Sequence, residues 1–175
     1  KFINFFFFLI YKKNNLNVLS ITKILSENLL KKSKINFLNL RLPGVLTYSL
    51  SDKRRPWLNN VLHKLKFNQK VKVYNKDKSF NEVIDSYEIY KFISDQFRKN
   101  KLNNNAFNLS ASKPIKLQRI ISYLKSRVNS KSQIDYLSMK RDDFKIYNKF
   151  NKIKYKLPTT RIVINRFLER KLYEE

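Results

Sequence analysis

The sequence offers few residues whose types could do chemistry, and the clearest candidates are cations. Arg54 and Arg55 are adjacent, and two guanidinium groups can clamp a nucleotide diphosphate through paired hydrogen bonds, although a charged loop explains them equally well. Cysteine is absent and histidine occurs once, at His63, which excludes disulfides, thiolate metal sites and histidine clusters. No carboxylate pair or nucleophile triad has a spacing that indicates catalysis.

Three further residues are candidates for ligand contact, and each has a simpler interpretation. Trp57, the only tryptophan, could stack on a base, although we expect it to anchor its helix in the core. Asn81 could contact a substrate or only shape its turn. Arg119 lies on a predicted helix whose other face is apolar, so it could point at substrate or at solvent.

The chain is organised around a strand-length apolar stretch that stops at Pro43 and Gly44. Proline cannot donate a backbone hydrogen bond, so a central strand should end there. Gly44 is the only glycine, and a turn is its ordinary explanation. The alternative is that the backbone passes close to a ligand at the carboxyl end of a strand, where open α/β sheets bind their ligands.

Elements on either side of this stretch predict an α/β fold. Apolar runs of strand length and apolar residues at helical spacing alternate along the chain. Strand, helix and strand over 5–42 predict a βαβ unit with parallel strands. The predicted strands are 5–10, 35–42, 71–74, 82–84, 106–109 and 134–137, and the predicted helices are 20–32, 57–65, one beginning at Asp85 as its N-cap, 114–128 and one following Pro158.

The net charge of +25 favours either an anionic partner or compositional drift. A nucleic acid or an anionic membrane surface would be attracted by such a charge. The lysines are spread along the whole chain, however, as coding biased toward Lys, Asn and Ile would produce. The apolar run over 5–10 is too short to span a bilayer, which takes about 20 residues. The lack of cysteine fits a reducing cytoplasm.

Several short segments match one family in order and spacing. They are Thr22-Lys23 with Glu27-Asn28-Leu29-Leu30, Leu40-Arg41-Leu42-Pro43-Gly44-Val45, Arg54-Arg55-Pro56-Trp57-Leu58, Val73-Tyr74-Asn75, Phe80-Asn81-Glu82-Val83-Ile84-Asp85, Phe107-Asn108-Leu109-Ser110, Lys113-Pro114-Ile115-Lys116-Leu117 and Leu157-Pro158-Thr159-Thr160. From Val18 onward the chain resembles the C-terminal half of the extended short-chain dehydrogenase/reductases. The resemblance is to the NAD-dependent epimerase/dehydratase group, which acts on nucleotide sugars.

The resemblance implies roles for individual residues. Lys23 would hydrogen-bond the ribose of NAD and lower the pKa of a catalytic tyrosine, and the Pro43-Gly44-Val45 segment would pass the nicotinamide. The residues implied on the substrate side are Arg54, Arg55, Trp57, Asn81 and Arg119.

Two departures from the family pattern bear on activity. Leu19 stands four residues before Lys23, where the family has its tyrosine, and leucine has no proton to give. One glycine cannot build the Gly-x-x-Gly-x-x-Gly loop that cradles the pyrophosphate. The N-terminal half of the dinucleotide-binding domain is therefore expected to be cut off or lost.

The sequence thus predicts an α/β fold, a partial Rossmann-like parallel sheet with a smaller C-terminal substrate-binding lobe. Residues 1–50 are predicted to be the end of the dinucleotide-binding domain, and residues 51–175 the substrate-binding lobe with interleaved sheet elements. The predicted function is that of a fragment or degenerate member of an NAD-dependent nucleotide-sugar epimerase/dehydratase, inactive alone, outside the membrane and in the cytoplasm. Its candidate partners are a nucleotide-sugar substrate and a second copy of the chain. The alternative is a basic nucleic-acid-binding or ribosome-associated protein.

Overall fold

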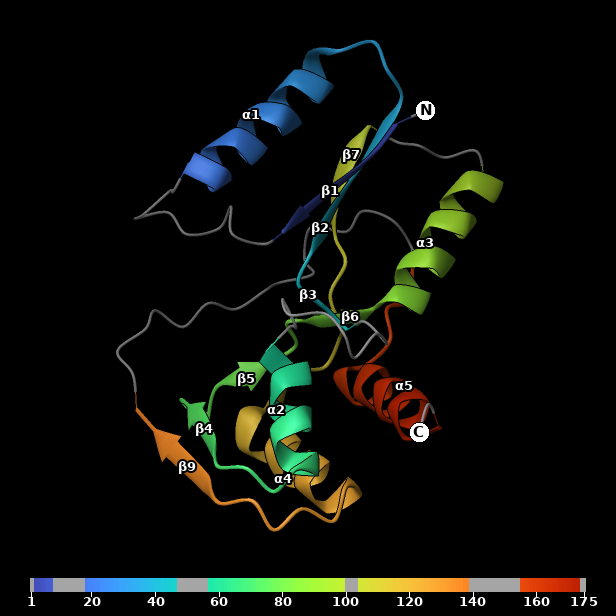
Figure 1. The fold of residues 1–175 in the computed structure, drawn as a ribbon. Helices are drawn as coiled ribbons and strands as arrows, with labels where there is room; N and C mark the ends of the chain where they lie inside the picture. Colours follow the sequence, from blue (N-terminus) through green and yellow to red (C-terminus); the bar gives the residue numbers. More distant parts are fainter. Residues whose placement is uncertain (1, 8–17, 47–56, 100–103, 139–154, 174–175) are drawn as a thin grey trace.

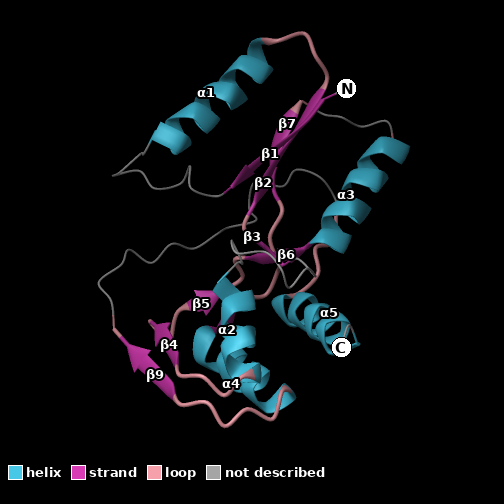
Figure 2. Ribbon diagram, in the orientation of Figure 1, coloured by secondary structure: helices cyan, strands magenta, loops and turns pink. Residues whose placement is uncertain are grey.

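The computed structural model describes residues 2–7, 18–46, 57–99, 104–138 and 155–173. An upper part consists of a parallel sheet with one helix on each face, and a lower lobe consists of three helices with short strand pairs (Figures 1 and 2). Two hydrophobic clusters correspond to these two parts. The expected α/β fold with a parallel sheet is confirmed, whereas the domain boundary at residue 50 stays a prediction.

The upper sheet has three parallel strands in the order β1-β2-β7. β1 (Phe2–Phe7) and β2 (Phe37–Leu42) are joined through α1 (Val18–Lys32), which makes the predicted βαβ unit. β7 (Asn105–Asn108) pairs with the other side of β2. α1 and α3 (Ser86–Arg98) lie on opposite sides of this sheet in Figure 1.

The two faces of β2 have different chemistry, which follows from the alternation of side chains along a strand. Leu38 and Leu40 are fully buried in a cluster with Phe92 of α3 and Phe107 of β7. Arg41 belongs to the alternate set of side chains, and it bonds to α1. An apolar face therefore packs on α3, and a polar contact fixes α1.

A two-point ion pair docks α1 on the sheet. Glu27, whose side chain is 5% exposed, accepts from Arg41 Nε at 2.8 Å and from Arg41 Nη2 at 2.6 Å. Paired guanidinium–carboxylate bonds fix orientation as well as distance. The helix is thus held at a defined angle although several of its apolar residues remain exposed.

After Pro43 the chain leaves the upper sheet and begins a second one. β3 (Gly44–Leu46) pairs in parallel with β6 (Val83–Asp85), with Gly44 opposite Val83. The Pro43-Gly44 step is therefore a junction between two strands that carries the chain toward the lower lobe. Interpreting it as an ordinary turn is wrong.

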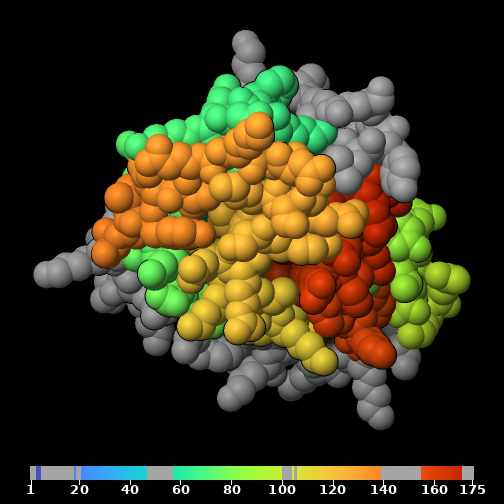
Figure 3. Space-filling model, turned by 90° about the horizontal axis from the view of Figure 1, so that it is seen from below, coloured from blue at the N-terminus to red at the C-terminus, as the bar shows by residue number. Residues whose placement is uncertain are grey.

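The lower lobe is built around α2 (Trp57–Lys66), α4 (Leu117–Arg127) and α5 (Thr160–Tyr173). β4 (Val71–Tyr74) pairs in parallel with β9 (Ile134–Leu137), and β5 (Ser79–Phe80) pairs antiparallel with β8 (Ile115–Lys116). Seen from below, β9 and α4 lie side by side, and α5 lies between α4 and α3 (Figure 3). The most buried residues of this core include Leu65, Ile121, Leu124, Val163 and Phe167.

Most predicted elements form, but several boundaries differ. The strand predicted over 5–10 is β1 at Phe2–Phe7, and the helix predicted from residue 114 begins at Leu117. The difference at α4 has a physical cause, since Ile115 pairs with Phe80 in β8 before the helix can start. The two-residue strands β5 and β8 were not expected, because their pairing depends on contacts that no local pattern shows.

We expect Glu27→Ala to lower the free energy of unfolding by about 3 kcal/mol, because it leaves the guanidinium of Arg41 without its buried partner. Urea denaturation measures the change. Glu82→Ala is the control, since it breaks the more exposed Lys78–Glu82 pair and should cost less than about 1 kcal/mol. Equal losses in the two variants would contradict the docking role of Glu27.

Candidate functional site

The Pro43-Gly44 junction lies against the strand that enters α3. A Cβ atom added to Gly44 would lie 3.4 Å from the carbonyl oxygen of Glu82, which is an ordinary van der Waals contact. The backbone of Gly44 does not have a positive φ angle. Neither packing nor conformation therefore requires glycine here, and close approach of a ligand to Gly44 and Val45 stays a prediction.

Two of the predicted substrate residues lie beside the β5–β8 pair. Trp57 begins α2, and its ring centroid is 5.8 Å from that of Phe80 in β5. Trp57 is 39% exposed whereas Phe80 is buried, so the expectation that Trp57 anchors the core is wrong. Arg119 is exposed in the first turn of α4, directly after β8. Arg54 and Arg55 lie outside the described residues.

Asn81 follows β5 and is buried. Its Nδ2 donates to the carbonyl oxygen of Ala111 at 3.0 Å, which ties the segment before β6 to the segment after β7. Asn81 also lies two residues before Val83, the partner of Gly44. Asn81 thus lies between β5, which contacts Trp57, and β6, which pairs with Gly44. Its side-chain amide holds the backbone at this point.

Lys23 lies on α1, in the upper part of the structure, and not in the lower lobe. Partial burial lowers the pKa of its ammonium group. The neighbouring hydroxyl groups are used within the helix, since Thr22 Oγ1 donates to the Val18 carbonyl at 2.8 Å and Ser26 Oγ to the Thr22 carbonyl at 3.0 Å. With Leu19 one turn before Lys23, this helix presents no hydroxyl at the position that the family pattern requires.

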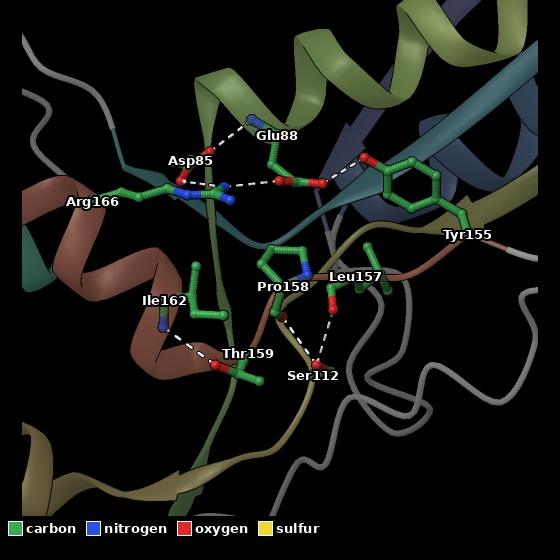
Figure 4. A network of polar contacts seen from close by, with 9 residues as sticks. All are labelled: Asp85, Glu88, Ser112, Tyr155, Leu157, Pro158, Thr159, Ile162 and Arg166. Carbon is green, nitrogen blue, oxygen red and sulfur yellow. Dashed lines mark hydrogen bonds and ion pairs between the residues drawn. The ribbon is translucent and has the colours of Figure 1, made fainter.

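The sequence did not reveal a buried polar network at the start of α3 (Figure 4). Asp85 Oδ1 accepts from the backbone N–H of Glu88 at 2.7 Å, which confirms Asp85 as the N-cap. Glu88, only 2% exposed, accepts from the Tyr155 hydroxyl at 2.5 Å and from Arg166 Nη1 at 2.9 Å. Arg166 Nη1 also lies 3.7 Å from Asp85 Oδ2. Only Asp85 carried a local signal; Tyr155 and Arg166 are distant in sequence.

Burial decides the protonation of this network. It raises the pKa of the Asp85 carboxyl, against the opposing effects of the Glu88 N–H and of Arg166. It also raises the pKa of Tyr155, as does the hydrogen bond to Glu88, so this hydroxyl stays a donor. Burial alone would lower the pKa of Arg166, but its bond to Glu88 and the charge of Asp85 raise it. Tyr155 and Arg166 thus keep their protons and their bonds to Glu88, which suits a structural clamp, whereas the buried Oδ2 of Asp85 accepts no hydrogen bond within the described residues.

A second set of bonds holds the segment that leads from Tyr155 into α5. The hydroxyl of Ser112 donates to the carbonyls of Leu157 at 3.2 Å and Pro158 at 3.0 Å (Figure 4). The Thr160 N–H donates to the Ser112 carbonyl at 2.8 Å. Pro158 is buried. The start of α5 is therefore fixed both to α3 and to the segment after β7.

The part of the chain that the structure describes contains no group of three or more His, Asp or Glu residues arranged to hold a metal ion. Within the same residues, no helix combines the length and apolar character needed to cross a membrane.

Several solved structures share the architecture at low sequence identity. The enzyme WbmG of Bordetella bronchiseptica, solved with NAD and UDP, matches 98% of this chain and 60% of its own at a TM-score of 0.73 and 16% identity. A UDP-N-acetylglucosamine 4-epimerase from Methanobrevibacter ruminantium, in complex with UDP-N-acetylmuramic acid, matches 99% and 63% at a TM-score of 0.73 and 14% identity. The dTDP-4-dehydrorhamnose reductase of Bacillus anthracis, with NADP, matches 99% and 64% at a TM-score of 0.73 and 11% identity.

The chain has the fold of the extended short-chain dehydrogenase/reductases. The predicted resemblance is thereby confirmed for the fold, over nearly the whole chain. This chain spans about 60% of the length of the first of these enzymes. No protein-family model and no curated protein matches the sequence.

The raised pKa of Asp85 predicts a pH dependence that Asp85→Asn removes, since asparagine also caps helices. A carboxyl with a higher pKa in the folded state binds its proton more tightly there than in the unfolded chain. Its contribution to the free energy of unfolding is therefore fully present below the unfolded pKa of about 3.9 and is lost as pH rises through the folded-state pKa. The free energy of unfolding of the unaltered chain should therefore fall relative to Asp85→Asn between pH 4 and neutrality, as followed by urea denaturation.

Asp135→Asn is the control of opposite sign. In the unaltered chain the hydrogen bond with Lys70 lowers the pKa of Asp135. The contribution of this carboxylate to the free energy of unfolding is therefore present above the unfolded pKa and is lost as pH falls through the folded-state pKa. If the free energies of unfolding of Asp85→Asn and of the unaltered chain differ by the same amount at every pH, burial does not raise the pKa of Asp85.

Proposed function

We propose that this chain is the nucleotide-sugar-binding part of an NAD(P)-dependent epimerase or reductase, and that it transfers no hydride by itself. The observation that carries the proposal is the fold likeness, which covers nearly the whole chain and includes enzymes solved with NAD, NADP, UDP or a UDP-sugar. In our proposal the lower lobe binds the nucleotide sugar, and β1, β2 and β7 belong to the cofactor-binding sheet.

The surroundings of Trp57 support a nucleotide site in the lower lobe. The indole is partly exposed and rests on the buried ring of Phe80, so a flat partner could stack on it without moving the core. Arg119 supplies an exposed cation on a helix that follows the strand paired with β5. A base on Trp57 and a phosphate near Arg119 would use both features, and Arg54 and Arg55 precede Trp57 in the sequence.

The residues present do not complete a dinucleotide site. In the sequence Leu19 stands four residues before Lys23, where the family pattern has its tyrosine, and the only glycine of the 175 residues is at the β2–β3 junction. A cradle of glycine N–H groups for the pyrophosphate therefore cannot form from this sequence. We infer that NAD, if it is used, needs groups beyond those described here.

We expect UDP to bind the chain and to quench the fluorescence of Trp57, the only tryptophan. Isothermal titration should show a roughly tenfold weaker UDP affinity for Trp57→Ala, since stacking of one base on an aromatic ring contributes about 1–3 kcal/mol. Tyr74→Ala is the matched control, because Tyr74 is an exposed aromatic on β4. An unchanged affinity in Trp57→Ala would remove the proposed base site.

The same preparation tests the absence of hydride transfer. Incubated with NAD and a UDP-sugar, the chain should produce no NADH fluorescence and no epimerised sugar, because Leu19 cannot serve as the acid or base. Turnover by the isolated chain would contradict this half of the proposal while leaving UDP binding intact.

We also propose that α1 forms a homodimer contact. Four apolar residues repeat along one side of the helix and remain 81%, 45%, 56% and 69% exposed, namely Val18, Ile21, Leu25 and Leu29. A twofold axis can bury such a stripe against its own copy. Light scattering should give a dimer mass for the chain and a monomer mass for Leu25→Glu, whereas Ile162→Glu on α5 should leave the dimer mass unchanged. A monomer mass for the unaltered chain would refute the contact.

A further inference from the structure

The outer face of α3 carries an aromatic residue followed by a cation twice, seven residues apart. Tyr90 precedes Lys91, and Phe97 precedes Arg98, while Tyr87 lies one turn before the first pair. Seven helical residues advance about 10.5 Å, so the two pairs follow one another on the same side of the helix. The three aromatic side chains are 43%, 70% and 41% exposed in the order Tyr87, Tyr90, Phe97.

A surface cavity of about 670 Å³ lies along this face. Its described lining residues come from α3 alone and are Tyr87, Tyr90, Lys91, Ile93, Ser94, Phe97 and Arg98. The lining therefore combines aromatic rings with two cations and includes no carboxylate among the described residues. Such a composition suits a partner that is both flat and anionic.

Charges on the neighbouring elements strengthen the positive character of this face. The guanidinium group of Arg170 on α5 lies 5.7 Å from the ring centre of Tyr87. That of Arg166 lies 5.4 Å from the same ring, but its charge is offset by its ion pair with Glu88. Of the α3 carboxylates, Glu88 is buried against Arg166, and Asp95 is paired with Lys99 at 2.9 Å. Glu169 is an exposed carboxylate on α5 that partly offsets these cations.

We propose that this face of α3 binds single-stranded nucleic acid. Bases stack on Tyr90 and Phe97, and the intervening phosphates lie near Lys91 and Arg98. Sequence-tolerant binding of single strands combines these two elements: aromatic rings for the bases and a cationic track for the backbone. An acidic peptide would use the cations but would gain little from exposed rings, which is why the repeated pairing with aromatics favours a nucleic acid.

The test must separate this site from the general attraction of a chain with net charge +25. Fluorescence anisotropy with a labelled oligouridylate measures affinity for the full chain and for Tyr90→Ala, which changes no charge. We expect the Kd to rise about tenfold in Tyr90→Ala, as loss of one stacked base implies, and to be restored in Tyr90→Phe. Tyr74→Ala, which removes a ring that is 45% exposed on β4, should leave the Kd unchanged.

Inorganic polyphosphate and polyglutamate are anionic probes without bases. Their affinity should be the same for the unaltered chain and Tyr90→Ala. In the oligouridylate assay, Lys91→Ala should reduce the slope of log K against log salt by about 0.7, the value for one phosphate contact on a single strand, more than Lys34→Ala does. An unchanged oligouridylate Kd in Tyr90→Ala, or an equal loss of polyphosphate or polyglutamate binding, would overturn the proposal.

Discussion

The described structure depends most on the buried carboxylate of Glu88. It accepts hydrogen bonds from Tyr155 and from Arg166, which lie 67 and 78 residues further along the chain. Glu88 is on α3, whose Phe92 belongs to the core of the upper sheet, whereas Arg166 is on α5, whose Phe167 belongs to the core of the lower lobe. A carboxylate buried to this extent is tolerated only because both its oxygens are bonded. Glu88 thus links a helix of the upper core to a helix of the lower core.

This arrangement also explains why the segment before α5 follows its particular course. Tyr155 packs edge-on against Phe92, with ring centroids 4.9 Å apart, while its hydroxyl reaches Glu88. A few residues later, Pro158 and Thr160 are fixed to Ser112 at the end of the upper strands. The apolar part of the tyrosine belongs to one core and its polar end closes the network, so packing and hydrogen bonding determine the same position.

Sequence reasoning succeeded where the signal is local. The alternating strands β4 and β9 were predicted with their observed limits, and Asp85 was predicted as an N-cap because a capping side chain bonds only three residues ahead. It failed where the signal is remote. Nothing near Tyr155 or Arg166 in the sequence indicates Glu88, and β5 and β8 are strands only because residues 79–80 and 115–116 meet. Trp57 was expected in the core since it is large and apolar, yet the smaller Phe80 fills that place.

The predicted site shows the same difference between local and remote sequence signals. The strand–Pro–Gly pattern correctly predicted that the strand ends at Pro43, because proline cannot continue the ladder of a central strand. It did not predict that a second parallel pair begins at Gly44, because that pairing depends on the distant residues of β6. The chemistry predicted for that point would need groups from several elements, and in the sequence Leu19 stands four residues before Lys23, where the family pattern has a tyrosine. The ion pairs Glu27–Arg41 and Glu88–Arg166 do not include Lys23, so these contacts stabilise the fold without the residue to which the family pattern assigns a catalytic role. Binding surfaces, by contrast, need only exposed rings and cations, and these the chain retains at Trp57 and along α3.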